Sequence, residues 1–162
     1  MANTERWLAG PVENIPPLLQ PVAHAMIQAE TEIIQIMNGF EESKLWERHR
    51  NIASAGFHLK HIRGVLDRLF TYARGEELTT EQLMYLKAEA VENGNIEELL
   101  AGISEQIKRS LSQLSQTDES ILTEFRGVGR KQIPSTVMGL LFHAAEHTMR
   151  HVGQLMVTVR LL

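Results

Sequence analysis

The most informative part of the sequence is FHAAEHTMRHVGQL, residues 142–155. It places His143, His147 and His151 four residues apart in an otherwise largely apolar segment. Residues at i and i+4 lie above one another on a helical face, with Cβ atoms about 5–6 Å apart. The sequence around it, residues 135–160, would be apolar on much of the circumference of such a helix. This pattern is typical of a helix that is buried or shared with a partner subunit.

Two imidazoles at this spacing can hold one metal ion, because zinc–nitrogen bonds are about 2.0–2.1 Å long. Each four-residue step turns about 40° around a helix of about 3.6 residues per turn, so the three histidines form a slowly drifting stripe. One ion would take an adjacent pair, and the third histidine would support a ligand or face the substrate. A second pair, three residues apart in GFHLKHIRG, offers a further ligand: His58 and His61.

Three protein ligands would leave positions open for water or substrate, which is the pattern of a catalytic metal site. Imidazole suits zinc, nickel, copper and iron, so the ligand type does not select the metal. Glu146 lies beside the histidines and is a candidate general base, although an acidic residue on a helix is more often a solvated group. A single histidine on an apolar helix is usually a hydrogen-bonded core residue. The alternative is therefore a bundle that binds a ligand or partner without catalysis and has polar core histidines.

Periodic apolar residues predict helices along most of the chain, and no strand-like alternation of useful length is found. The stretch RGVGRKQIP, residues 126–134, contains two glycines and a proline and is expected to be a loop that leads into the last helix. These patterns predict a single all-α domain over residues 1–162, a four-helix bundle with a short extra helix between its second and third long helices. The expected helices are residues 21–38, 54–74, 79–91, 96–114 and 135–160.

Composition narrows the classes of function. The formal net charge is −4 and the isoelectric point is about 6.0, which argues against a nucleic-acid-binding protein. The chain has no cysteine, which excludes disulfides, thiolate metal sites and a cysteine nucleophile. The N-terminus lacks the features of a signal peptide, and the apolar runs are far shorter than the roughly 20 residues that span a bilayer. We therefore expect a cytoplasmic protein with no membrane partner.

Two segments of the chain, residues 56–83 and 128–155, resemble the DinB-like superfamily of metal-binding bundles. The most specific element is a His-x3-His pair followed by Gly-Gln, here His147, His151, Gly153 and Gln154. The resemblance implies an up-down-down-up four-helix bundle and a divalent metal ion, zinc or nickel, held by His61, His147 and His151. It also implies a homodimer.

Characterised members of this superfamily transfer or isomerise small molecules with low-molecular-weight thiols, and others are assigned as metal-dependent hydrolases. By resemblance, we expect a metal-dependent transferase or hydrolase that acts on a small-molecule substrate, with a low-molecular-weight thiol as a candidate partner. The chain departs from the family's pattern at Arg150 and Val152, so the substrate does not carry over. Further candidates near the site or its pocket are His58, His143, Glu146, Tyr72 and Arg130.

Overall fold

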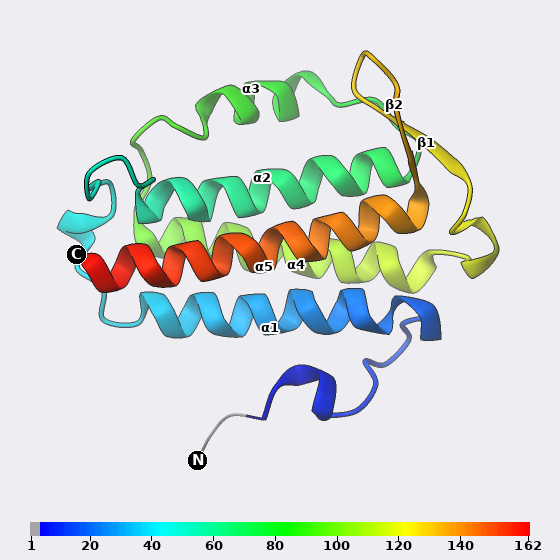
Figure 1. Ribbon diagram of the computed structural model, residues 1–162, viewed down its shortest axis with the longest axis horizontal. Helices are drawn as coiled ribbons and strands as arrows, with labels where there is room; N and C mark the ends of the chain where they lie inside the picture. The colour runs from blue at the N-terminus through cyan, green and yellow to red at the C-terminus, as the bar shows by residue number, and fades with distance from the viewer. Residues whose placement is uncertain (1–3) are drawn as a thin grey trace.

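The computed structural model describes residues 4–162, which form five α-helices and one β-hairpin (Figure 1). Short 3-10 turns at Arg6–Leu8, Pro17–Leu19, Glu42–Lys44 and Glu119–Ile121 lie between them or at their ends. In chain order the main elements are α1 (Gln20–Met37), α2 (Ala55–Ala73), α3 (Thr80–Ala88), α4 (Ile96–Gln116), β1 (Phe125–Val128), β2 (Ile133–Thr136) and α5 (Val137–Leu161).

Four long helices make the bundle, and α5 packs between α1 and α2, while α4 contacts α1 and α2 from the other side. Helices α1 and α5 run in one direction and α2 and α4 in the opposite direction (Figure 1). The short helix α3 lies over α2, on the crossover that returns the chain from the end of α2 to the start of α4. The predicted up-down-down-up bundle with an extra helix between α2 and α4 is therefore confirmed.

Side-chain caps explain why most predicted helix starts lie within a residue or two of the observed ones. The Ser54 side chain accepts a hydrogen bond from the backbone of Phe57 at the start of α2. Thr79 and Asn95 begin α3 and α4 with capping boxes, in which the residue three positions later bonds back to the cap. Such a cap satisfies backbone donors that the first helical turn leaves unpaired.

The segment before α5 differs from the prediction. Residues 126–134 were expected to be a loop, but most of them belong to an antiparallel hairpin in which Phe125 pairs with Thr136 and Val128 with Ile133. Each strand has four residues and is exposed or half-buried throughout, so no alternation of apolar and polar residues marks it in the sequence. Helix α5 begins at Val137 and not at Ser135, because Thr136 is its cap.

The centre of the bundle is apolar, and α5 contributes a continuous buried stripe to it. Its buried side chains include Leu140, Leu141, Ala144, Val152 and Leu155. Not every apolar side chain of α5 is buried, however, since Phe142 is 62% exposed. Among the described residues, no helix combines the length and apolar character needed to cross a membrane.

Candidate metal centre

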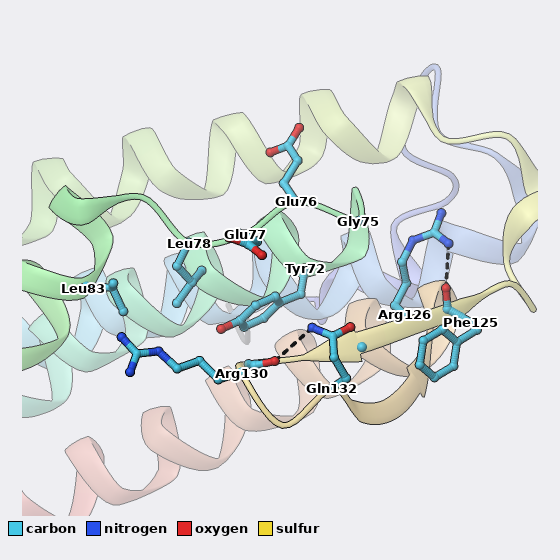
Figure 2. A pocket seen from close by; sticks show the side chains of 12 residues that line it. Tyr72, Gly75, Glu76, Glu77, Leu78, Leu83, Phe125, Arg126, Arg130 and Gln132 are labelled. Atoms are coloured by element: carbon cyan, nitrogen blue, oxygen red, sulfur yellow. Dashed lines mark hydrogen bonds between the residues drawn. The ribbon is translucent and has the colours of Figure 1, made fainter.

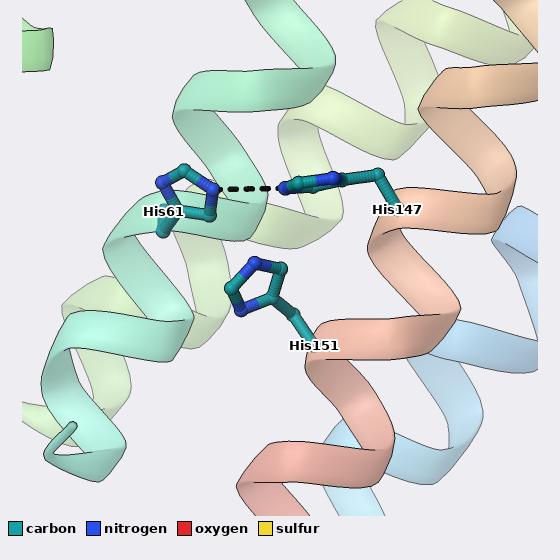
Figure 3. Close-up of side chains that lie close together, drawn as sticks. All are labelled: His61, His147 and His151. Carbon is teal, nitrogen blue, oxygen red and sulfur yellow. Dashed lines mark hydrogen bonds between the residues drawn. The ribbon is translucent and has the colours of Figure 1, made fainter. Parts of the chain in front are cut away.

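Three imidazoles from two helices meet between α2 and α5 (Figure 3). His61 comes from α2, and His147 and His151 come from successive turns of α5. One ring nitrogen of each lies within 4.8 Å of those of the other two. The Nε2 atoms of His61 and His147 are 3.0 Å apart. The ring centroid of His151 is 4.5 Å from that of His61 and 4.7 Å from that of His147.

This donor set suits a divalent metal ion. With zinc–nitrogen bonds of about 2.0–2.1 Å and tetrahedral angles, two ligating nitrogens lie about 3.3 Å apart. The 3.0 Å separation of His61 Nε2 and His147 Nε2 is close to that value. With all three ring nitrogens within 4.8 Å of one another, the three-imidazole group could hold an ion.

Glu89, just after the end of α3, orients His61. The His61 Nδ1 atom donates to Glu89 Oε2 at 2.7 Å, since a carboxylate only accepts. The other carboxylate oxygen accepts from Arg68 Nη1 at 2.5 Å, and Glu89 is only 4% exposed. In neutral His61 the proton at Nδ1 leaves the lone pair on Nε2, which faces His147. A carboxylate behind a ligating histidine fixes the tautomer and the ring orientation in this way in many metal sites.

Sequence reasoning missed Glu89, and its position depends on two residues of α2. A Cβ atom at Gly64 would collide with the Glu89 carboxylate and lie 2.7 Å from Arg68 Nη1, so only glycine leaves room for this ion pair. Lys60 is 5% exposed and donates to the carbonyls of Ala88 (2.6 Å) and Val91 (2.9 Å) at the end of α3. These contacts fix the segment that carries Glu89.

His58 supports His151. The Nδ1 atoms of the two residues are 3.0 Å apart, so one donates to the other, and the other nitrogen of His151 remains for an ion. His58 itself is only 3% exposed. Burial, and next the charge of His61, lowers the pKa of His58 to about 4, so this ring is neutral near pH 7. Of the two sequence candidates on α2, His61 thus faces the cluster and His58 lies behind it.

The surroundings also keep the two α5 imidazoles neutral. Burial is the largest cause that lowers the pKa of His151 to about 3, and the neighbouring His61, His147 and His58 lower it further. Burial and the charges of His61 and His143 likewise lower the pKa of His147. Neutral imidazole is the form that binds metals.

The Nδ1 atom of His147 is buried with no hydrogen-bond partner among residues 4–162, so no side chain orients this ring as Glu89 orients His61.

Two other candidates lie on the outer side of α5. His143 Nδ1 is 3.4 Å from Glu146 Oε2, and the same carboxylate accepts from Arg150 Nε at 3.0 Å. The hydrogen bond from Arg150 is the main reason that the pKa of Glu146 is lowered. His143, Glu146 and His147 form a second group with donor atoms within 4.8 Å, but it shares His147 with the first group and is more exposed.

Tyr72 and Arg130 lie together, but away from the imidazole cluster. They line a cavity of about 930 Å³ between the end of α2, the start of α3 and the hairpin (Figure 2). Leu78, Leu83 and Phe125 add apolar surface to it. None of the three clustered histidines is among its lining residues, so the structure separates these two candidates from the imidazole cluster.

A profile of the DinB superfamily matches residues 25–155, which include all of the clustered histidines. The chain belongs to the DinB superfamily. A search of curated proteins finds no match to this DinB-superfamily protein.

Solved structures agree on the fold of this DinB-superfamily member. A conserved protein from Enterococcus faecalis superposes with a TM-score of 0.74 at 16% identity, over 89% of this chain and 96% of that chain. A protein from Streptococcus pneumoniae superposes with a TM-score of 0.62 at 13% identity, over 86% of each chain. At such low identity these likenesses establish the architecture alone.

Proposed function

We propose that this DinB-superfamily protein binds a divalent metal ion through His61, His147 and His151 and uses it to act on a small molecule. The observation that carries the proposal is the convergence of three ring nitrogens within 4.8 Å, one of them backed by a buried carboxylate. Zinc and nickel are the metals that we expect. A low-molecular-weight thiol as partner and a homodimeric state remain predictions from the family resemblance.

In this proposal each neighbouring side chain has a defined task. Glu89 accepts a hydrogen bond from His61 Nδ1–H and so keeps the Nε2 lone pair turned to the ion. His58 holds His151 through the Nδ1 contact. Phe57 stacks on His61, with ring centroids 5.5 Å apart and planes 11° from parallel, and shields that ring from water. When bound, the ion would polarise a substrate oxygen or favour the thiolate form of a thiol.

Metal content of protein purified without an immobilised-metal column tests the binding step. We expect close to one equivalent of zinc or nickel per chain in the wild type. His147→Gln should lose most of it, whereas the matched control His143→Gln, one turn away on the same helix and exposed, should retain it. Less than a tenth of an equivalent in the wild type, not restored by added zinc or nickel, would contradict the proposal.

The reaction class needs a separate measurement. Metal-loaded protein would be incubated with an epoxide or an activated alkene, with and without a panel of low-molecular-weight thiols. Consumption that requires both metal and thiol identifies a transferase, and consumption that is equal without thiol identifies a hydrolase. The absence of both, with metal still bound, would favour the alternative of a non-catalytic ligand-binding bundle.

A further inference from the structure

A second recess, of about 320 Å³, lies at the N-terminal end of α2. Its walls come from the loop before that helix, from the first turn of the helix and from the residue after Glu89. They comprise Arg48, Arg50, Asn51, Ile52, Ala53, Phe57 and Ala90. The sequence motifs that point to the histidines do not include this loop.

The recess adjoins the imidazole cluster on two sides. Phe57, which forms part of its wall, stacks on the ring of His61 at a centroid distance of 5.5 Å. Ala90, on another wall, directly follows Glu89, whose carboxylate accepts from His61 Nδ1. Two wall residues of the recess therefore belong to the immediate surroundings of His61.

The polar part of the wall is basic, although the whole chain carries a net charge of −4. Arg48 lies 3.7 Å from Glu92, and both side chains are about half exposed, so this ion pair is weak. Within residues 4–162 the exposed side chain of Arg50 has no ion-pair partner. Guanidinium groups present paired donors that match the oxygens of a carboxylate or a phosphate.

The rest of the wall limits the size and character of the ligand. Ile52, Ala53, Phe57 and Ala90 are apolar, so they would contact a hydrocarbon portion next to the anionic group. The volume is near the lower end of the roughly 300–1,000 Å³ that small-molecule pockets span. A single ring or a short chain with one acidic group fits these limits.

We propose that this recess binds the carboxylate or phosphate group of a small apolar anion and anchors it beside the histidine centre, with Arg50 as the main contact and Arg48 as the second. The inference rests on the proposed function where it identifies this kind of anion as the substrate class. It also makes a claim about binding that holds with or without a metal ion.

The probes are benzoate, phenyl phosphate and the uncharged benzamide, titrated by calorimetry into chelator-treated and zinc-loaded protein. We expect saturable binding of at least one anion to both protein forms and none of benzamide. Benzoate binding more tightly than phenyl phosphate would assign the anion as a carboxylate, and the reverse order as a phosphate. No saturable binding of either anion would overturn the proposal.

Arg50→Gln should lower the affinity for the anion about tenfold, as expected for loss of a charge-assisted hydrogen bond. The matched control is Arg130→Gln, which removes the same charge from the hairpin cavity and should change the affinity less than twofold. Equal losses in the two variants would mean a general charge effect and would overturn the proposal, as would an unchanged affinity in Arg50→Gln. Because metal content is measured separately in each variant, anion binding without metal binding would contradict the proposed function alone.

Discussion

At the scale of single residues, the centre depends on imidazoles that are neutral and held in place. Burial supplies the first condition, since the pKa of His58 is lowered to about 4 and that of His151 to about 3. Hydrogen bonds supply the second, from His61 to Glu89 and between His58 and His151. The sequence identified the histidines, but the residue that orients the first of them was identified only by the structure.

Glu89→Gln should weaken metal binding by about 10- to 100-fold, because the amide is a poorer acceptor for His61 Nδ1–H and ligand-orienting partners typically have effects of this size. Affinity would be measured by competition with a chromophoric chelator. Arg68 is 8% exposed and would lose its charged partner, so the free energy of unfolding should fall as well.

The matched control for this change is Glu105→Gln, which removes a carboxylate that pairs with the exposed Arg109. It should leave metal affinity unchanged, since exposed ion pairs contribute little. An affinity in Glu89→Gln within twofold of the wild type would show that this carboxylate only stabilises the fold.

The depressed histidine pKa values also predict how stability depends on pH in metal-free protein. In the unfolded chain these histidines bind protons near pH 6.5, whereas His58 and His151 in the folded protein bind them only near pH 4 and pH 3. The unfolded state therefore binds more protons between these values, and the free energy of unfolding should fall as pH drops from about 6.5 towards 4. For the buried His58, the largest decrease in the free energy of unfolding is on the order of 3 kcal/mol.

Urea titrations at a series of pH values measure this slope. His58→Gln should flatten it, because one of the histidines with a lowered pKa is removed. His143→Gln, which removes an exposed histidine, should leave it as in the wild type. A slope that is the same in His58→Gln as in the wild type would show that His58 is not protonated on unfolding in this range.

At the scale of secondary-structure elements, α2 carries a glycine where a helix would normally disfavour it. In helix interiors glycine costs about 1 kcal/mol relative to alanine. Gly64 is nevertheless required, because a Cβ atom there would collide with the Glu89 carboxylate. This glycine in the middle of a predicted helix was the signal in the sequence that another group approaches α2 closely.

Gly64→Ala should therefore destabilise the protein and weaken metal binding, since displacement of Glu89 and Arg68 outweighs the gain in helix propensity. Gly153→Ala on α5 is the matched control, because a Cβ there has no atom within 4 Å. It should raise the free energy of unfolding by about 0.5–1 kcal/mol. If Gly64→Ala is stabilised to the same extent in chemical denaturation, the close approach of Glu89 to α2 is not maintained in solution.

The elements also explain what the sequence could and could not predict. Helix boundaries at Ser54, Thr79 and Asn95 were predictable because each cap is local. The contact between His61 and Glu89 spans 28 residues and depends on how α3 crosses α2, which no spacing in the sequence encodes. The hairpin was missed because its strands are short and lack a buried face.

At the scale of the whole molecule, the up-down-down-up order places α2 beside α5, although more than sixty residues separate them in sequence. The histidines of the two helices are brought together by this packing alone. A metal ion at His61, His147 and His151 would link the two helices in the folded state, and the same ligands are dispersed in the unfolded chain. Binding should therefore contribute to stability by mass action.

At a free zinc concentration about 100 times the dissociation constant, this linkage should stabilise the fold by about 2.7 kcal/mol. For a chain of this size, that corresponds to a rise in Tm of roughly 5–10 °C in calorimetry. His151→Gln should abolish the rise and His143→Gln should retain it, because only the former removes a proposed ligand. A wild-type Tm that is identical in excess zinc and in chelator would mean that the three imidazoles are a polar core contact and not a metal centre.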